Sequence, residues 1–207
     1  GVNLYTTVHA GSALLIPDRL ASSFIGVARD LLATPGVLKL LVFQALMVKL
    51  CPSCSLSLEQ VQRQPLVRGV MTQVGRLDEL ERWVGRVEAN FRVPRSALRF
   101  RNEQACSDCD HSIPILRGTS GRTVVAEMIE PLCEPEFLEG VKKQDGVGLY
   151  RWFTHRSQQA LLTAEPQRQS ARQIAIYKMA QGILDPRDVQ ARFGALDALV
   201  SVREARA

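Results

Sequence analysis

The chain has 207 residues, of which 46% are hydrophobic and 23% are charged, and this composition suits a folded protein with one sizeable core or two small ones. The net charge is +5, but the basic residues are scattered among acidic ones, so we expect no direct contact with nucleic acid. The most apolar stretch, residues 36–50, contains two lysines and is shorter than the roughly 20 residues of a membrane span, so we expect no transmembrane helix.

The first fifty residues are expected to form one strand and two helices. Residues 4–8 are mostly β-branched or aromatic, which predicts a strand that carries His9 at its end. Residues 19–32 have apolar side chains at helical spacing, which predicts an amphipathic helix. Residues 37–50 are apolar nearly all round, which predicts a buried helix.

The middle of the chain is expected to contain two helices and a strand. Apolar side chains at spacings of three and four predict helices over residues 58–67 and 72–91. Gly118 and Gly121 are expected to bracket a turn, and the alternating residues 122–129 then predict a strand.

The last third is expected to be helical. Asp185 is a predicted N-cap, Pro186 follows it as the first helical residue, and that helix is expected to stop at Gly194. Residues beyond about Ser201 are expected to fray. Earlier helices are predicted over residues 134–143, 149–162 and 170–181, the last capped by Gly182.

Two Cys-x-x-Cys pairs are the strongest chemical signal in the sequence. They consist of Cys51, Cys54, Cys106 and Cys109. Each pair presents two thiolates on one tight turn, and together they predict one structural Zn²⁺ site with a closed shell of four cysteines. The pairs are separated by 51 residues, far more than the roughly 15–20 of a simple zinc ribbon, so we expect a folded insertion at 55–105.

The sequence also allows other roles for the cysteines. The pairs could be buried and reduced without metal, or could form disulfides, although the sequence has no secretory signal peptide and cytosolic disulfides are rare. His111 could replace one of the thiolates as a ligand. Cys133 is expected to be a small buried hydrophobe.

The sequence contains no phosphate-binding Gly-x-x-x-x-Gly-Lys-Ser/Thr loop and no Gly-x-Gly-x-x-Gly motif. Among the histidines, only His9 is expected at the end of a strand, where a side chain can reach a ligand from a rigid base. Taken alone, a histidine in such a place is more often structural.

An ordered series of motifs changes that reading. The series is Thr-Thr-Val-His-Ala at 6–10, Ile-Pro-Asp-Arg-Leu at 16–20, Gln-Ala-Leu-Met-Val-Lys-Leu-Cys-Pro-Ser-Cys at 44–54, Ala-Cys-Ser-Asp-Cys at 105–109 and Gly-Arg-Thr-Val-Val-Ala-Glu-Met-Ile at 121–129. It resembles the histidine box, the arginine-leucine helix, the two cysteine pairs and the Gly-Arg-Thr strand of the type II secretion and type IV pilus assembly ATPases, the GspE/PulE/PilB family.

The resemblance implies an α/β fold. On it, the chain is the C-terminal part of a RecA-like P-loop ATPase core with an inserted tetracysteine zinc module and a helical C-terminal tail. We expect the ATPase core at 1–50, the zinc module with its helical insertion at 51–130, and the helical region at 131–207. We also expect the chain to begin after the phosphate loop of a longer protein.

The same resemblance implies a hexameric ATPase that powers assembly of a type IV or conjugative pilus, or type II secretion. It places His9 near the γ-phosphate in a catalytic or sensing role, and it makes Arg19 a candidate for nucleotide binding. ATP and Mg²⁺ would bind chiefly to the half that precedes this chain.

The expected location is the cytoplasm, peripheral to the inner membrane through a platform or regulatory protein that binds the zinc module. A zinc-stabilised interaction module without enzymatic activity is the alternative. A DNA-contacting element, suggested by a pI of about 9.2, is a weaker one.

Overall fold

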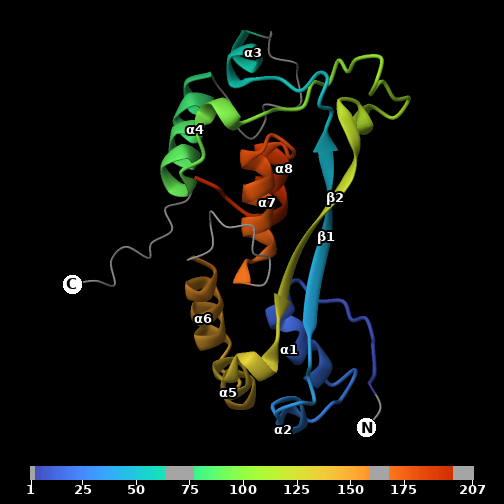
Figure 1. The fold of residues 1–207 in the computed structure, drawn as a ribbon, viewed down its shortest axis with the longest axis vertical. Coiled ribbons are helices and arrows are strands. Elements are labelled where there is room, and N and C mark those ends of the chain that lie inside the picture. Colours follow the sequence, from blue (N-terminus) through green and yellow to red (C-terminus); the bar gives the residue numbers. More distant parts are fainter. Residues whose placement is uncertain (1–2, 64–76, 159–167, 198–207) are drawn as a thin grey trace, which may run out of the picture. The chain divides into compact units, whose positions relative to one another are not determined.

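The computed structural model describes residues 3–63, 77–158 and 168–197, and Figure 1 shows their fold. The chain forms two compact units. Unit 1 comprises Gly1–Ala45 with Val124–Ile174, and unit 2 comprises Leu46–Thr123 with Ala175–Ala207. The three-part division at 1–50, 51–130 and 131–207 stays a prediction.

A two-stranded antiparallel sheet is the only sheet in the described part of the chain. Strand β1, Leu41–Leu50, pairs with strand β2, Thr119–Ile129, and the two run side by side in Figure 1. The helix predicted over 37–50 is therefore wrong. A strand with apolar side chains on both faces has no period that distinguishes it from a buried helix. Its pairing partner lies far along the chain, at Thr119–Ile129.

The prediction for β2 was nearly complete. The strand predicted over 122–129 is confirmed and begins three residues earlier. Gly121 lies inside the strand, so the expected turn between two glycines is wrong. Gly118 precedes the strand with φ +72°, and a Cβ there would lie 2.2 Å from the carbonyl oxygen of Asn102, so glycine is needed at this close approach.

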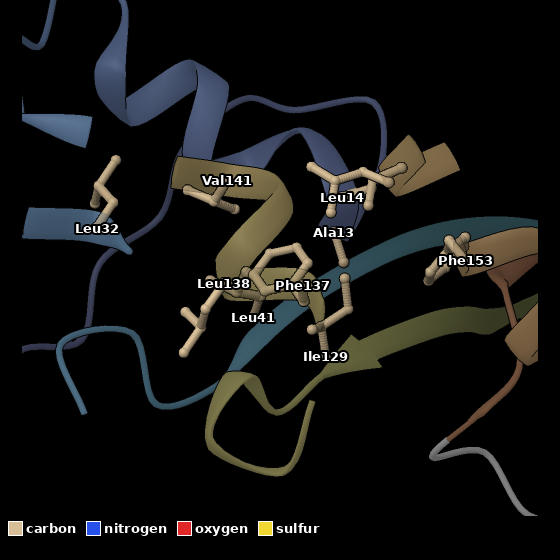
Figure 2. Packing of buried hydrophobic residues seen from close by; sticks show 10 residues of the cluster. Ala13, Leu14, Leu32, Leu41, Ile129, Phe137, Leu138, Val141 and Phe153 are labelled. Atoms are coloured by element: carbon tan, nitrogen blue, oxygen red, sulfur yellow. The ribbon is translucent and has the colours of Figure 1, made fainter. Parts of the chain in front are cut away.

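Unit 1 is mostly helical around one core. Its elements besides the strand ends are η1 (Ala13–Leu15), α1 (Ile16–Ala21), α2 (Arg29–Leu32), η4 (Pro131–Cys133), α5 (Pro135–Lys143), α6 (Gly146–Gln158) and the start of α7 (Ala171–Ala180). Figure 2 shows the core where α5 packs on η1 and the strand ends. Its fully buried members include Ala13, Ile129 and Phe137.

The N-terminal predictions were the least accurate. Residues 4–8 have no regular structure and are largely exposed, so the predicted strand is wrong. The single helix predicted over 19–32 is wrong as well, since α1 and α2 are separate. The N–H groups of Ile25 and Gly26 both donate to the carbonyl of Ser22, and Gly26 has φ +77°, so a turn interrupts the helical pattern.

The predictions for the C-terminal third were more accurate. Helices α5 and α7 are confirmed, and α6 is confirmed in the described residues but begins at Gly146, before its predicted start at residue 149. Residues 159–162 lie outside the described part. Ser170 and Gln173 bond each other's backbone N–H at the start of α7, as in a capping box. Gly182 has φ +71° just past its end, as expected for a cap.

Unit 2 contains the insertion between the cysteine pairs and the C-terminal helix. Its helices include α3 (Leu58–Arg63), α4 (Leu77–Phe91), η2 (Arg95–Ala97), η3 (Pro114–Leu116) and α8 (Pro186–Phe193). Helices α3 and α4 confirm the predicted pattern in the described residues, and residues 64–76 lie outside them. The N-cap prediction is confirmed, because the Asp185 carboxylate accepts the N–H of Arg187. The helix ends before Gly194, and residues beyond Ser201 lie outside the described part.

Helix α4 packs on the segment that follows α7. The indole N–H of Trp83 donates to Gln190 Oε1 at 2.9 Å, and the Asn90 amide donates to the Leu196 carbonyl at 3.0 Å. Leu80, Trp83, Val84 and Val87 of α4 are buried as well. The insertion is therefore part of the core of unit 2 and holds the C-terminal helix.

Candidate metal centre

The structure brings the four cysteines of the two pairs together. Their sulfur atoms all lie within 4.8 Å of one another. The Sγ atoms of Cys51 and Cys106 are 3.9 Å apart, those of Cys54 and Cys109 are 3.4 Å apart, and those of Cys106 and Cys109 are 3.6 Å apart. Four ligands at a Zn–S distance of about 2.3 Å in a tetrahedron are about 3.8 Å from each other, so the cluster fits Zn²⁺.

Each pair sits in a short turn, and we call the turns the first knuckle (residues 51–54) and the second knuckle (residues 106–109). The first follows β1 directly, and the N–H of Cys51 donates to the Gly118 carbonyl at 2.9 Å. In the second, the Cys106 carbonyl accepts the N–H groups of Cys109 and Asp110. Backbone hydrogen bonds thus shape both knuckles.

Further contacts hold the knuckles in register. Ser53 Oγ donates to Asp108 Oδ2 at 2.8 Å, which joins the tips of the two turns. The backbone of Leu56 pairs with Phe100 in an isolated antiparallel bridge. Both residues are buried, and Phe100 is fully so. The chain therefore enters and leaves the insertion at one point beside the cysteines.

The thiols differ in acidity. Burial, followed by hydrogen bonds from the other cysteines, raises the pKa of Cys54 far above its usual range. Burial also raises the pKa of Cys109, but the backbone N–H of Cys106 and the neighbouring thiols outweigh it and lower that pKa to about 7. Cys109 can thus supply a thiolate near neutral pH, and a bound cation favours the thiolate form of a cysteine ligand.

The structure distinguishes among the other roles predicted for the cysteines and for His111. All five cysteines are free, so neither pair forms a disulfide. His111 is exposed, and its Nδ1 accepts the N–H of Ile113 at 2.9 Å. Among the described residues it lies outside the cysteine cluster. Cys133 is exposed, so its prediction as a buried hydrophobe is wrong, because it ends a 3₁₀ turn at the surface.

The two predicted nucleotide residues lie apart from the cysteines. His9 is exposed in the irregular segment before η1. Arg19 is exposed on α1, and its guanidinium lies 5.9 Å from the ring centroid of Phe24. Both side chains are therefore accessible to a ligand, and their roles stay predictions.

The family model described as type II/IV secretion system protein matches residues 1–189. The chain belongs to this family. The match covers His9 and both knuckles, and it confirms the family indicated by the motif series. No curated protein matches the chain.

The secondary structure bears on the family assignment. The mixed helical and strand architecture agrees with an α/β fragment of such a protein. None of the helices in the described ranges is long and apolar enough to cross a membrane.

One buried polar residue of unit 1 was not identified from the sequence. Glu127 lies within the Gly-Arg-Thr strand motif and is 4% exposed. The sequence did contain a signal for its burial. Side chains alternate along a strand, so Glu127 lies on the same face as Val125 and Ile129, which are fully buried. A charged residue in a buried register needs hydrogen-bond partners, and its partners come from two helix starts.

Proposed function

We propose that the chain is part of a hexameric ATPase that powers type IV or conjugative pilus assembly, or type II secretion. The observation that carries this proposal is the family match, which spans residues 1–189 and includes both knuckles and His9. The proposal includes a RecA-like core, to which residues 1–50 contribute. It also places the protein in the cytoplasm, at the inner membrane through a partner.

His9 is the residue of this chain that would act at the nucleotide. An exposed imidazole can hydrogen-bond a terminal phosphate or the attacking water, and can therefore report hydrolysis. Arg19 is exposed ten residues further on and offers a permanent positive charge for phosphate oxygens. ATP and Mg²⁺ would be held chiefly by a phosphate loop, which this sequence does not contain.

The four cysteines would hold a structural Zn²⁺ ion. Four thiolates leave no open position for water, so the ion would stabilise unit 2 and take no part in chemistry. The knuckle tips carry exposed side chains, among them Asp108, and could contact an inner-membrane platform or regulatory protein. Rotation of subunits during ATP hydrolysis would pass to that partner through the zinc module.

ATP turnover by the complete protein tests the proposal. We expect His9→Ala to lower kcat by about 10²-fold, in the range of a lost catalytic group, while the hexamer still assembles. His155→Ala is the matched control, because His155 is also exposed but lies on α6. Unchanged turnover in an assembled His9→Ala hexamer would remove His9 from the mechanism.

A zinc-stabilised interaction module without ATPase activity is the second candidate. It is favoured by one observation, that the four cysteines of the described residues form a complete metal site by themselves. The coding sequence upstream of Gly1 distinguishes the two. A Gly-x-x-x-x-Gly-Lys-Ser/Thr motif there supports the ATPase, and its absence supports the module.

A further inference from the structure

Glu127 is a buried carboxylate at the end of the Gly-Arg-Thr strand. It lies on β2 in unit 1 and is 4% exposed, and the neighbours on its face, Val125 and Ile129, are fully buried. Burying a carboxylate is costly unless several hydrogen bonds compensate for the lost water. The residue therefore calls for a specific set of partners.

Its two oxygens bond the first backbone N–H groups of two helices. Oε1 accepts the N–H of Ala13 at 2.8 Å, and Oε2 accepts the N–H of Ala171 at 2.8 Å. These residues begin η1 and α7. The first N–H groups of a helix have no partner inside it, and a carboxylate is the favoured acceptor at that end.

The charge of Glu127 is also balanced by a neighbouring guanidinium. Arg156 of α6 attracts it electrostatically, and Arg156 itself is held by Glu134 at 2.9 Å and by the Met128 carbonyl at 2.8 Å. This arrangement leaves little freedom for the Glu127 side chain. Its position is therefore fixed relative to the starts of both helices.

The bond to Ala13 matters for the segment that carries His9. Ser12 precedes η1 in an extended conformation and makes no side-chain cap bond. Residues 3–10 have no regular structure. Ala13 is fully buried, so its N–H is the point where the exposed segment enters the core of unit 1.

We propose that Glu127 is a positioning residue for His9. By holding the N–H of Ala13, its carboxylate fixes the end of the segment 9–12, and so sets where the imidazole of His9 lies at the nucleotide. This inference rests on the proposed ATPase function. The structural part of the proposal, that Glu127 orders residues 9–13, can be tested whether or not the protein is an ATPase.

The first test is a double-mutant cycle on ATP turnover by the complete protein. Glu127→Gln keeps the size of the side chain. Its amide group, however, has one acceptor oxygen, whereas the carboxylate offers a separate oxygen to each of the two N–H groups. We expect kcat to fall by about tenfold or more, as for a misplaced catalytic group, with KM for ATP little changed. Glu136→Gln is the control, because Glu136 is exposed on α5.

The double variant His9→Ala with Glu127→Gln decides how the effect arises. If Glu127 acts through His9, the double variant turns over as fast as His9→Ala alone, because the interaction has already been lost. If the two losses multiply, Glu127 acts independently of His9 and the proposal is wrong.

Hydrogen exchange of the peptide covering residues 9–15 is the second test. We expect Glu127→Gln to speed exchange there by about tenfold, whereas Glu136→Gln leaves it unchanged. Unchanged exchange in Glu127→Gln overturns the proposal.

If Glu127→Gln does not fold, Glu127→Asp replaces it. This variant keeps the charge but is one methylene too short to reach both N–H groups, and both turnover and exchange are measured in the same way. If His9→Ala has no effect on turnover, the ATPase role of His9 fails, while exchange still tests Glu127.

Discussion

The Sγ atoms of Cys54 and Cys109 lie 3.4 Å apart, although the two residues are 55 positions apart in the chain. The insertion between them folds back so that it enters and leaves beside the knuckles, at the bridge between Leu56 and Phe100. Helix α4 of this insertion then packs on the segment that contains Gln190. A metal ion at the knuckles would therefore close a loop whose interior is part of the core of unit 2.

Replacing one thiol should remove the ion and destabilise unit 2. We expect Cys109→Ser to lose bound zinc and to lower the free energy of unfolding of unit 2 by several kcal/mol, about the cost of losing a structural metal site. Cys133→Ser is the control, because Cys133 is exposed and outside the cluster. The measurement is urea unfolding followed by Trp83 fluorescence in a Trp152→Phe background. Equal zinc content in both variants would contradict the prediction.

Gln190 connects α8 to the insertion. Its Oε1 accepts the indole N–H of Trp83 at 2.9 Å and the N–H of Leu196 at 3.1 Å. Gln190→Ala leaves the buried indole donor unpaired, so we expect a loss of about 1–3 kcal/mol in the free energy of unfolding. Arg192→Ala, at an exposed position of the same helix, should change it by less than about 0.5 kcal/mol. Chemical denaturation of both variants checks this, and equal stabilities would refute the link.

Asp185 combines a helix cap with a buried ion pair. Its carboxylate accepts the N–H groups of Arg101 and Arg187, each at 2.8 Å, and the Arg187 guanidinium at 2.6 Å. Asp185→Ala leaves that guanidinium without its partner, so we expect a loss of about 3–5 kcal/mol. Asp185→Asn keeps a capping oxygen and should cost less. Thermal unfolding ranks the two variants, and a larger loss for Asp185→Asn would contradict the prediction.

Glu127 should make unit 1 less stable as the pH rises. Burial raises its pKa above the usual 4.5, although the N–H groups of Ala171 and Ala13 and the charge of Arg156 act in the opposite direction. The native state therefore holds this proton more tightly than the unfolded state. The resulting stabilisation is complete below pH 4.5 and is lost as the pH rises through the raised pKa.

The difference in stability between the wild type and Glu127→Gln measures this effect. We expect the wild type to lose stability relative to the variant as the pH rises from about 4.5, because the variant has no proton to release. Burial also raises the pKa of Glu134, but that group is present in both proteins. Trp152 fluorescence in a Trp83→Phe background reports on unit 1. A difference that does not change with pH would refute the raised pKa.

The sequence predicted best where local chemistry decides the structure. The cap at Asp185, the glycine after α7 and the alternating half of β2 all depend on residues within a few positions of one another. The cysteine cluster was also predictable, although its halves are far apart, because two Cys-x-x-Cys turns favour a common ion. The insertion between them was expected to be folded, and α4 shows that it is.

The sequence predicted worst where distant partners decide the structure. Strand β1 is apolar on both faces, so only its pairing with β2 separates it from a buried helix. Residues 4–8 have strand-like composition but no neighbouring strand in the described structure, and they stay irregular. Glu127 was part of a recognised motif, yet its role depends on two N–H groups that lie 114 and 44 positions away.

Zinc content, measured together with a count of reactive thiols, decides whether the four cysteines hold one structural ion. We predict one Zn²⁺ per chain, one reactive thiol in the folded protein, from the exposed Cys133, and five after chelation and unfolding. Removal of the ion should also unfold unit 2. A folded protein with no zinc and with reactive thiols at the knuckles would show that the cysteines hold no structural ion.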